Sequence, residues 1–572
     1  MQIRKLILIV TVIVLILTSG GCSGSYIPQN PPEVVSGVVP HHLLAKDIIE
    51  GFFNYVSEKA SPETVILLSP DHFHQCAISG VDFITTKSSN FMGIDVDNDL
   101  IHTLSTYYKI MKGDSGVGTD HGITNIVPFI RESFPQAKIA PFLVSLNMSI
   151  ERIKSFTESL NMLTGRDTLV IASVDFSHYL PETVADFHDI KSVRTLINFD
   201  EEGFNNLEVD SPQSLYAARY FAFLRGAENY HIVAHKNAQD YMEEIPVEET
   251  TSYASVTFEK GNIIHSLPVE ESKTLLFTGD IMLDRGVEKL MDEYNLNYPF
   301  EKIKNVLKGA DFVVGNLEGP ISSNSVEFDA KSLKFCFRKE AASVLKDMHF
   351  NLLSLANNHT YDLGYSGLAE THNISKSVGL LTVGNPLNIS ENTGLKQDNI
   401  VFVAFNLTSK FNESELLTIV RKTRQQSPTE FIILILHWGE EYSPHSCEWE
   451  QILAHHFIDN GADLIIGTHP HVVQEIELYH SSTRSKDALI FYSLGNFIFD
   501  QYFSRETQEG LMVALEISKD AQKYTLIPVK LPMSQPQLMN FEEKESFLRK
   551  LSEKSSNNLK NKIKEGIINI QS

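Results

Sequence analysis

The chain has 572 residues, which is too long for one ordinary hydrophobic core and predicts two or three domains. Its formal net charge of -24 argues against a nucleic-acid binder, which would need a basic face, and fits a soluble surface outside a cell. The 4 cysteines are too few and too scattered for a disulfide framework or a structural zinc cluster.

The first residues have the pattern of an export signal. A basic start is followed by the apolar run Leu6–Leu17, which is too short to span a membrane comfortably. The run leads to Thr18-Ser19-Gly20-Gly21-Cys22, which resembles a bacterial lipoprotein lipobox, except that Ser19 stands where that pattern usually has leucine. The resemblance implies a lipoprotein signal peptide over residues 1–22, lipidation of Cys22, and a tether over residues 23–32. An uncleaved anchor is the alternative, and both interpretations place the protein at the extracytoplasmic face of the cell membrane.

Strand-like apolar runs lead into histidines between about residues 33 and 265. These runs are Val34–Pro40 before His41, Val65–Asp71 before His72, the stretch that opens at Asp120-His121, and Leu169–Asp175 before His178. The segments between them, such as Leu44–Lys59 and Asp186–Phe199, are helix-like. Apolar runs that alternate with helices predict an α/β layer around a largely parallel sheet. In such sheets a site forms at the carboxyl ends of the strands, where these histidines would meet.

This pattern resembles the Memo-like family, including protein B of the AmmeMemoRadiSam system, whose fold is related to class III extradiol dioxygenases. The motifs that carry the resemblance are Pro40-His41, Ser69-Pro70-Asp71-His72, Asp120-His121 and Ser173-Val174-Asp175-Phe176-Ser177-His178. It implies an α/β Memo-like domain over residues 33–265 with His41, His72, His121 and His178 in a shared site. Imidazoles with one carboxylate suit iron, copper or zinc, so one such ion is expected. The alternative is that these histidines are remnants of a site or satisfied core residues.

A second series of strand-like runs, between about residues 272 and 532, delivers carboxylates, amides and imidazoles in turn. The runs are Lys273–Gly279 before Asp280, Ala310–Gly315 before Asn316 and Glu318, Phe350–Ala356 before Asn358, His359 and Asp362, Phe431–Leu436 before His437, Leu464–Gly467 before His469 and His471, and Ile490–Gly495 before Asn496. Pro470 lies between two of the histidines and should stiffen their loop. Oxygen ligands hold hard ions and imidazoles hold borderline ones, so the series predicts a hydrolytic site for two divalent metal ions.

The same motifs, in the same order, resemble the CapA family of poly-γ-glutamate biosynthesis, which looks like calcineurin-type metallophosphoesterases. The resemblance implies a four-layer α/β/β/α domain over residues 272–532. The expected metal ligands are Asp280, Asn316, Glu318, Asn358, His437, His469 and His471. His359, Asp362 and Asn358 are the expected catalytic residues, with His359 as the general acid. Two positions depart from the wider phosphoesterases: Met282 stands in place of a histidine, and Asn316 with Glu318 stands in place of a bridging aspartate.

Arg285, Arg338 and Asn496 are the predicted substrate contacts. An acidic protein that handles an acidic polymer needs a local cation or the metals themselves as the attractive element. Glu440 and Glu441 are interpreted as a solvated rim. Residues 533–572, dense in Lys and Glu with spaced apolar residues, predict a C-terminal helical extension.

The resemblance implies an exported, lipid-anchored, metal-dependent hydrolase. Its partner would be an extracellular anionic polymer such as poly-γ-glutamate, or a precursor, handled beside the capsule synthesis machinery and not a nucleic acid. A non-enzymatic surface component that binds or tethers polymer is the alternative of a different class. A second alternative is metal-dependent oxidative chemistry in the N-terminal domain. The residues leave the identity of the metals open.

Overall fold

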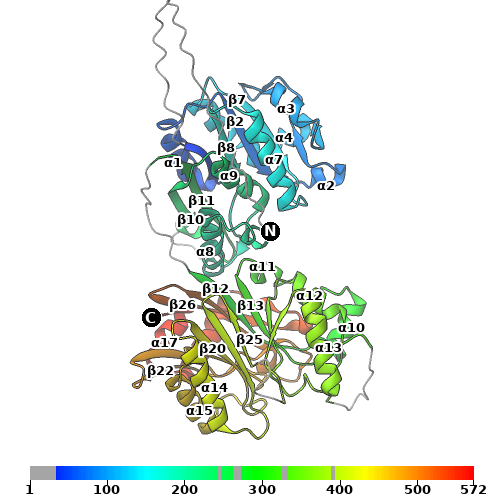
Figure 1. The fold of residues 1–572 in the computed structure, drawn as a ribbon, viewed down its shortest axis with the longest axis vertical. Helices are drawn as coiled ribbons and strands as arrows, with labels where there is room; N and C mark the ends of the chain where they lie inside the picture. The colour runs from blue at the N-terminus through cyan, green and yellow to red at the C-terminus, as the bar shows by residue number, and fades with distance from the viewer. Residues whose placement is uncertain (1–33, 243–246, 262–271, 325–332, 388–392, 572) are drawn as a thin grey trace, which may run out of the picture. The chain divides into compact units, whose positions relative to one another are not determined.

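The computed structural model describes residues 34–571 except 243–246, 262–271, 325–332 and 388–392 (Figure 1). The predicted signal peptide, the tether and Cys22 therefore lie outside the described residues. Among the described helices, none is both long enough and apolar enough to cross a membrane.

A mixed sheet organises the N-terminal half, with strand order β10-β11-β1-β8-β2-β7-β3-β6. Strands β1, β8, β2 and β7 run parallel at its centre, and β11 pairs with β1 in the antiparallel direction. The central strands are almost wholly buried because their Val-, Ile- and Leu-rich runs are covered on both faces. The strands are β1 (Val34–Val39), β2 (Thr64–Pro70), β3 (Phe83–Thr85), β6 (Ile110–Lys112), β7 (Lys138–Val144), β8 (Thr168–Ser173), β10 (Asn229–Asn237) and β11 (Thr250–Glu259), with β9 (His178–Leu180) beside β11 and a separate pair β4 (Asn90–Phe91) and β5 (Ile94–Asp95).

Helices lie between these strands along the chain. They are α1 (Lys46–Ser57), α2 (Gln75–Ser79), α3 (Asn98–Leu104), α4 (Asp114–Val117), α5 (His121–Thr124), α6 (Val127–Ser133), α7 (Ile150–Leu163), α8 (Glu182–Asn198) and α9 (Pro212–Leu224). The helix-like segments of the sequence correspond to α1 and α8, whose ends differ from the expected ones by a few residues, as helix ends usually do.

Two sheets form the C-terminal half. The larger has the order β17-β16-β13-β12-β25-β26-β27, and the smaller has the order β18-β19-β20-β21-β23-β22. The larger contains β12 (Lys273–Ile281), β13 (Phe312–Leu317), β16 (Leu352–Ser354), β17 (Leu381–Val383), β24 (Asn496–Ile498), β25 (Glu509–Ile517), β26 (Ala521–Lys530), β27 (Gln537–Leu538) and β28 (Ile567–Gln571). The smaller contains β18 (Gly394–Gln397), β19 (Ile400–Asn406), β20 (Phe431–His437), β21 (Leu464–Thr468), β22 (Ile476–Ser481) and β23 (Lys486–Phe491), and β14 (Ile321–Ser322) pairs separately with β15 (Phe337–Arg338).

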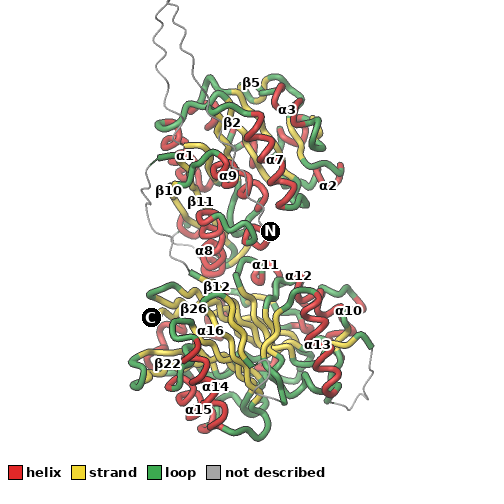
Figure 2. The backbone as a smooth tube through the Cα atoms, viewed as in Figure 1, coloured by secondary structure: helices red, strands yellow, loops and turns green. Residues whose placement is uncertain are grey.

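Alternating side chains place these two sheets face to face between helices. Ile433 of β20 packs in one core with Leu275 of β12, whereas the next residue, Leu434, packs with α14 and α15. Leu276 of β12 packs on the opposite side, with α10, α12 and α13. The result is the expected α/β/β/α arrangement, in which the strands form a block with helices on either side (Figure 2). The helices are α10 (Arg285–Glu293), α11 (Lys304–Leu307), α12 (Glu340–Asp347), α13 (Gly364–Ser377), α14 (Glu413–Gln426), α15 (Glu448–Asp459), α16 (Phe541–Lys554) and α17 (Lys560–Glu565).

The C-terminal extension is only partly helical. After α16 and α17, strand β28 pairs antiparallel with β26 and joins the larger sheet. Ile568 and Ile570 are buried while Asn569 between them is exposed, which is the period of a strand. The predicted helical extension over residues 533–572 is therefore wrong for residues 567–571, where the spacing of the apolar residues changes from helical to alternating, and for residues 537–538, which form β27.

Candidate metal centres

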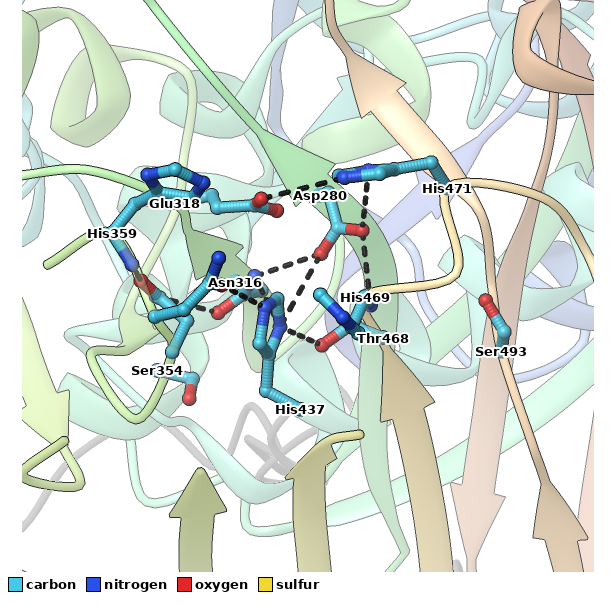
Figure 3. A network of polar contacts seen from close by, with 12 residues as sticks. Asp280, Asn316, Glu318, Ser354, His359, His437, Thr468, His469, His471 and Ser493 are labelled. Carbon is cyan, nitrogen blue, oxygen red and sulfur yellow. Dashed lines mark hydrogen bonds and ion pairs between the residues drawn. The ribbon is translucent and has the colours of Figure 1, made fainter. Parts of the chain in front are cut away.

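The strand ends of both C-terminal sheets meet at one buried cluster (Figure 3). Asp280 near the end of β12 lies opposite Asn316 of β13 in register, and Nδ2 of Asn316 donates a hydrogen bond to Oδ1 of Asp280 at 2.7 Å. From the smaller sheet, His437 ends β20 and His469 follows β21. The backbone N–H of His469 donates to Oδ2 of Asp280 at 3.2 Å. The face-to-face packing thus brings residues far apart in the sequence into direct contact.

Two glycines permit this approach of the strand ends. A Cβ on Gly279 would lie 1.9 Å from the backbone oxygen of Gly495, and a Cβ on Gly467 would lie 1.9 Å from that of Tyr492. Neither distance is compatible with a side chain. The segment before Asn496 can therefore approach β12 and β21 this closely only because positions 279 and 467 are glycine. This approach brings Asn496 to the cluster, where its Oδ1 lies 3.0 Å from Nδ1 of His471.

The loop after β21 holds two histidines in an uncommon backbone conformation. His469 has φ 99° and His471 has φ 59°, a region that costs a non-glycine residue on the order of 1 kcal/mol. Nδ1 of His471 lies 3.3 Å from Oδ2 of Asp280, and Nε2 of His471 lies 3.6 Å from Oε1 of Glu318. Burial lowers the pKa of His469 to about 4, which keeps its imidazole neutral, and neutral imidazole is the form that binds metals.

Glu318 supplies the strongest sign that cations belong in this cluster. Its side chain is fully buried, and neither carboxylate oxygen has a hydrogen-bond partner among the described residues. Burial and the neighbouring charge of Asp280 raise the pKa of Glu318 well above its usual value. A buried carboxylate without a partner is costly, and a bound cation would remove that cost. The donor set therefore fits divalent ions.

Two groups of side chains at this cluster are arranged so that each could hold a metal ion. One is Asp280, Glu318 and His437, and the other is Glu441, His469 and His471; within each group the ligand atoms lie within 4.8 Å of one another. The rings of His437 and His469 have their centroids 4.7 Å apart, so the two groups adjoin. The interpretation of Glu441 as part of a solvated rim missed this contact, because a glutamate in an exposed loop carries no sequence signal of its partner.

His359 and Asn358 complete the cluster from the loop after β16. Oδ1 of Asn358 lies 2.7 Å from Nε2 of His437. Nδ1 of His359 lies 2.9 Å from Oδ2 of Asp362, which also accepts the backbone N–H of Phe335 at 2.8 Å. Because the carboxylate accepts, Nδ1 of His359 must donate, and Nε2 is left for other chemistry. All of the metal ligands and catalytic residues expected from the sequence thus lie in or beside one cluster, and their roles stay predictions.

The three predicted substrate contacts have different surroundings. Arg285 begins α10 and pairs with Asp500. Arg338 is held by two carboxylates of α10, at 2.7 Å from Glu288 and 2.8 Å from Asp292, which leaves its charge neutralised. The Nδ2 of Asn496 donates to the backbone oxygen of Thr507 at 2.9 Å, so this amide is engaged in orienting His471.

A second histidine cluster lies near the ends of β1 and β2: His41 follows β1, His72 follows β2, and His121 begins the short helix α5. His41, His72 and His121 have ligand nitrogens within 4.8 Å of one another. The rings of His72 and His121 have their centroids 3.9 Å apart, and that of His41 lies 4.9 Å from that of His72. They line a cavity of about 590 Å³ together with His178, which belongs to no metal-capable group among the described residues. The ends of β1 and β2, together with the start of α5, thus bring three of the four predicted histidines together, and the fourth, His178, lines the cavity.

Two aspartates that sequence reasoning did not single out also face these histidines. Oδ2 of Asp210 lies 3.4 Å from Nε2 of His41 and 3.8 Å from Nε2 of His72, while its buried Oδ1 has no partner among the described residues. Oδ2 of Asp175 lies 3.4 Å from Nε2 of His41. Asp175 ends an apolar run and could have been noticed, but Asp210 precedes α9 and follows no strand.

The pKa values of these three histidines are shifted in different directions. Burial lowers the pKa of His41 to about 3, and burial with the neighbouring His72 lowers the pKa of His121. Burial also opposes protonation of His72, but hydrogen bonds with Asp120 and Asp210 prevail and raise its pKa to about 10. A bound cation could take the place of the proton on His72, beside Asp210, whose Oδ1 has no partner among the described residues. Asp120 contacts Nδ1 of His72 and fixes the orientation of the imidazole ring.

Comparison with known proteins finds a different family in each half. A family model described as bacterial capsule synthesis protein PGA_cap matches residues 274–501, and one described as Memo-like protein matches residues 28–232. The "Capsule biosynthesis protein CapA" of Bacillus anthracis is 30% identical over 266 residues, which cover 42% of this chain and 63% of that protein. The "PGA biosynthesis protein CapA" of Bacillus subtilis (strain 168) is 30% identical over 281 residues, covering 46% of this chain and 72% of that protein. A "MEMO1 family protein" of Caldivirga maquilingensis is 23% identical over 246 residues, which cover 41% of this chain and 86% of that protein.

Proposed function

The chain belongs to the CapA family of bacterial capsule synthesis proteins and carries a Memo-like domain ahead of its CapA-like part, and from this premise we propose that it is a metal-dependent hydrolase of an extracellular anionic polymer. The proposed substrate is a poly-γ-glutamate-like chain or its precursor, because two relatives are named for capsule or PGA biosynthesis. The observation that carries the proposal is the convergence of two metal-capable groups around Glu318, whose buried oxygens have no partner among the described residues.

The described residues around the cluster have the roles that hydrolysis needs. Asp280, Glu318 and His437 would hold one divalent ion, and Glu441, His469 and His471 a second. Ions at such a pair of sites supply an acidified water and positive charge opposite the leaving oxygen. Asp362 fixes the tautomer of His359, so that Nε2 of His359 can give a proton to the leaving group.

The remaining polar groups hold these side chains in place. Asn316 donates to Asp280, and its Oδ1 accepts from Nδ2 of Asn357 at 3.0 Å. Thr468 contacts Nδ1 of His437 at 3.0 Å, and Asn496 contacts His471. Hydrogen bonds to side chains that hold a metal fix the orientation of the imidazole rings and position the ligand atoms.

We also propose that the protein is exported and held at the outer face of the cell membrane by a lipid on Cys22. The apolar run ahead of the lipobox-like stretch supports this proposal, together with the net charge of -24, which suits a surface exposed to the medium. Metabolic labelling with a palmitate analogue tests it: the full chain should be labelled, and the Cys22→Ala variant should not. Equal labelling of both chains would refute the anchor.

Elemental analysis is the decisive test of the metal proposal. The detergent-solubilised full-length chain, purified without added metal, is compared with the His469→Ala/His471→Ala double variant. We expect the double variant to lose metal relative to the wild-type chain and to lose any hydrolysis of polymer amides or phosphoesters. His480→Ala is the matched control, because this histidine is exposed and its ion pair among the described residues is with Asp487. Metal content that is equal in wild type and double variant would favour a non-enzymatic polymer-binding component instead.

A second candidate function concerns the N-terminal domain. Two imidazoles and a carboxylate with open positions form the donor set of mononuclear iron oxygenases, and His41, His72 and Asp210 offer such a set at a cavity. The partnerless Oδ1 of Asp210 favours a bound cation there. We therefore propose a separate single-metal centre in this half.

Nested variants test this second centre. In the His469→Ala/His471→Ala background, the metal that remains reports on the N-terminal half. We expect about one ion per chain there, and its loss on adding Asp210→Ala, whereas adding Asp82→Ala, which removes a surface partner of Arg152, should leave it. Retention of the metal in the triple variant would rule out Asp210 as a ligand.

A further inference from the structure

Arg285 lies beside the C-terminal metal cluster in a setting that links it to two of the cluster's histidines. Its guanidinium lies over the ring of Phe335, 4.9 Å from the centroid, and over that of Phe499, at 5.7 Å. The Phe335 ring is 4.3 Å from the ring of His359, and the Phe499 ring is 4.8 Å from that of His471. Each of these two aromatic rings therefore lies close both to the guanidinium and to a histidine of the candidate site.

The fold holds Arg285 firmly while leaving donors unused. Asp500 accepts a hydrogen bond from Nη2 of Arg285 and another from the backbone N–H of Gly286 at 3.0 Å. Arg285 itself has φ 51°, an uncommon value for a non-glycine residue, so its position is maintained against a backbone cost. Nε is buried and, like Nη1, makes no hydrogen bond to any described residue. A purely structural arginine would be expected to use these donors.

The charges around the cluster explain why such a cation would be needed. Asp280, Glu318, Asp362 and Glu441 gather at the site, so these carboxylates would balance the charge of two bound divalent ions and leave no net attraction for an anion. Arginine is suited to oxyanions because its planar fork donates parallel hydrogen bonds.

We propose that Arg285, held by Asp500 and the rings of Phe335 and Phe499, is the oxyanion-recognition residue of the C-terminal site and receives a phosphate or carboxylate group of the substrate beside the metals. This inference rests on the proposed hydrolase function, since it places the substrate at the same cluster. Tyr442 extends the surface: its ring lies 5.9 Å from that of His471 and 5.1 Å from that of Phe503, which is 66% exposed. The substrate thus presents an anionic group to Arg285 and a less polar part to these two rings.

Calorimetric titration of the metal-loaded full-length chain with inorganic phosphate, and separately with γ-glutamyl-glutamate, tests the proposal. We expect Arg285→Ala to weaken binding of at least one probe by about 10- to 100-fold, as loss of a charge-assisted hydrogen bond does. Arg285→Lys should restore part of the affinity because it returns a point charge without the fork. Weakening for phosphate alone identifies a phosphoryl group, and weakening for the dipeptide alone identifies a carboxylate.

Controls separate this inference from the proposed function. Arg549→Ala removes a surface arginine that pairs with Glu553 on α16, and it should bind both probes as the wild type does. Metal content is measured for every variant and should equal that of the wild type. If the wild type holds no metal, the hydrolase proposal fails whatever Arg285 does. If metal is present but both probes bind the Arg285→Ala and Arg285→Lys variants as tightly as the wild type, the recognition role of Arg285 is refuted and its function is to tie α10 to Asp500.

Discussion

Asn316 donates a hydrogen bond to Asp280 across two adjacent parallel strands, at the centre of the C-terminal metal cluster. An aspartate at position 316 would lose this donor and add a charge beside a buried carboxylate. The pair therefore stabilises the cluster in the absence of metal, at the expense of one anionic ligand.

Asn316→Asp is expected to separate the stability of the metal-free and metal-bound states. Without metal, the lost donor and the like charge should lower the free energy of unfolding by about 2 kcal/mol. With manganese or zinc in excess, the added carboxylate should enlarge the stabilisation that the metal gives. Thermal melts in chelator and in metal check this, with Asn316→Ala as a control that removes the donor without adding charge. A metal-induced gain no larger than that of the wild type would contradict the expectation.

Asp362→Asn should affect catalysis without affecting metal binding. The amide can no longer act as the carboxylate that fixes Nδ1 of His359 as a donor, so the proton donor is misaligned. We expect kcat on a chromogenic phosphodiester or polymer amide that the wild type hydrolyses to fall about 100-fold. Metal content should stay at the wild-type level. Asp292→Asn, on the exposed side of α10, is the control; a similar loss in both variants would point to a general structural effect.

Gly467→Ala should disrupt the joint between β21 and the segment at Tyr492. The added Cβ would meet the Tyr492 backbone oxygen at 1.9 Å and the Trp438 indole nitrogen at 2.7 Å, and backbone cannot move aside as a flexible side chain can. The expected loss is about 3 kcal/mol of unfolding free energy, together with reduced metal content. Gly394→Ala on β18 is the matched control, because its nearest atom is 3.8 Å away. Chemical denaturation that shows equal stability for the two variants would refute the close-packing argument.

Protonation of Asp463 at acidic pH should lower the free energy of unfolding of the C-terminal half. Burial opposes ionisation, but Lys486, Arg424 and Arg484 together lower the pKa of Asp463 below its usual value. A carboxyl with a lowered folded-state pKa contributes stability above its unfolded pKa of about 3.9, and that contribution is lost as the pH falls through the folded value.

The corresponding variant is Asp463→Asn. At pH 7 it should lose about 3 kcal/mol, because two arginines and a lysine lose their buried partner. The difference from the wild type should shrink as the pH falls below about 4. Denaturant melts across this range provide the measurement. Asp487→Asn, an exposed carboxylate on β23, should change stability little at any pH; a pH-independent effect at position 463 would argue that packing, and not charge, is responsible.

The spacing of the apolar residues, and the order of the polar residues that follow each apolar run, predicted much of this structure. Runs such as Phe431–Leu436 before His437 mark buried strands, and strand ends in α/β sheets gather at sites. That logic holds for Asp280, Asn316 and Glu318 and for the histidines of the C-terminal cluster, which lie at or after strand ends; it does not hold for His121, which begins α5. It fails for Asp210 and Glu441, which lie in loops and approach their partners only through tertiary packing. It also fails at β28, where a short alternating stretch follows helix-forming sequence.

The position of Arg285 shows a different limit of sequence reasoning. The sequence marks this arginine as a candidate contact, but nothing in Gly279–Gly286 indicates that Phe335 and Phe499 will converge on its guanidinium. Arg338 carries an equal signal and ends between two carboxylates of α10. Which arginine keeps unused donors is decided by neighbours from distant segments.

The joining of two sheets at one cluster also bears on how the protein would acquire the proposed metal ions. Asp280 comes from the first strand of the C-terminal half, whereas His471 and its partner Asn496 come from segments near the end of that half. One of the two metal-capable groups, Asp280, Glu318 and His437, is spread over residues 280–437, so its donor atoms come together only when the chain folds. If the chain crosses the membrane unfolded, as the proposed signal implies, the choice of metal falls to whichever ions are available outside the cytoplasm when the two sheets close. The supply of ions in that compartment, and not only the donor atoms, would then decide which metal the protein binds.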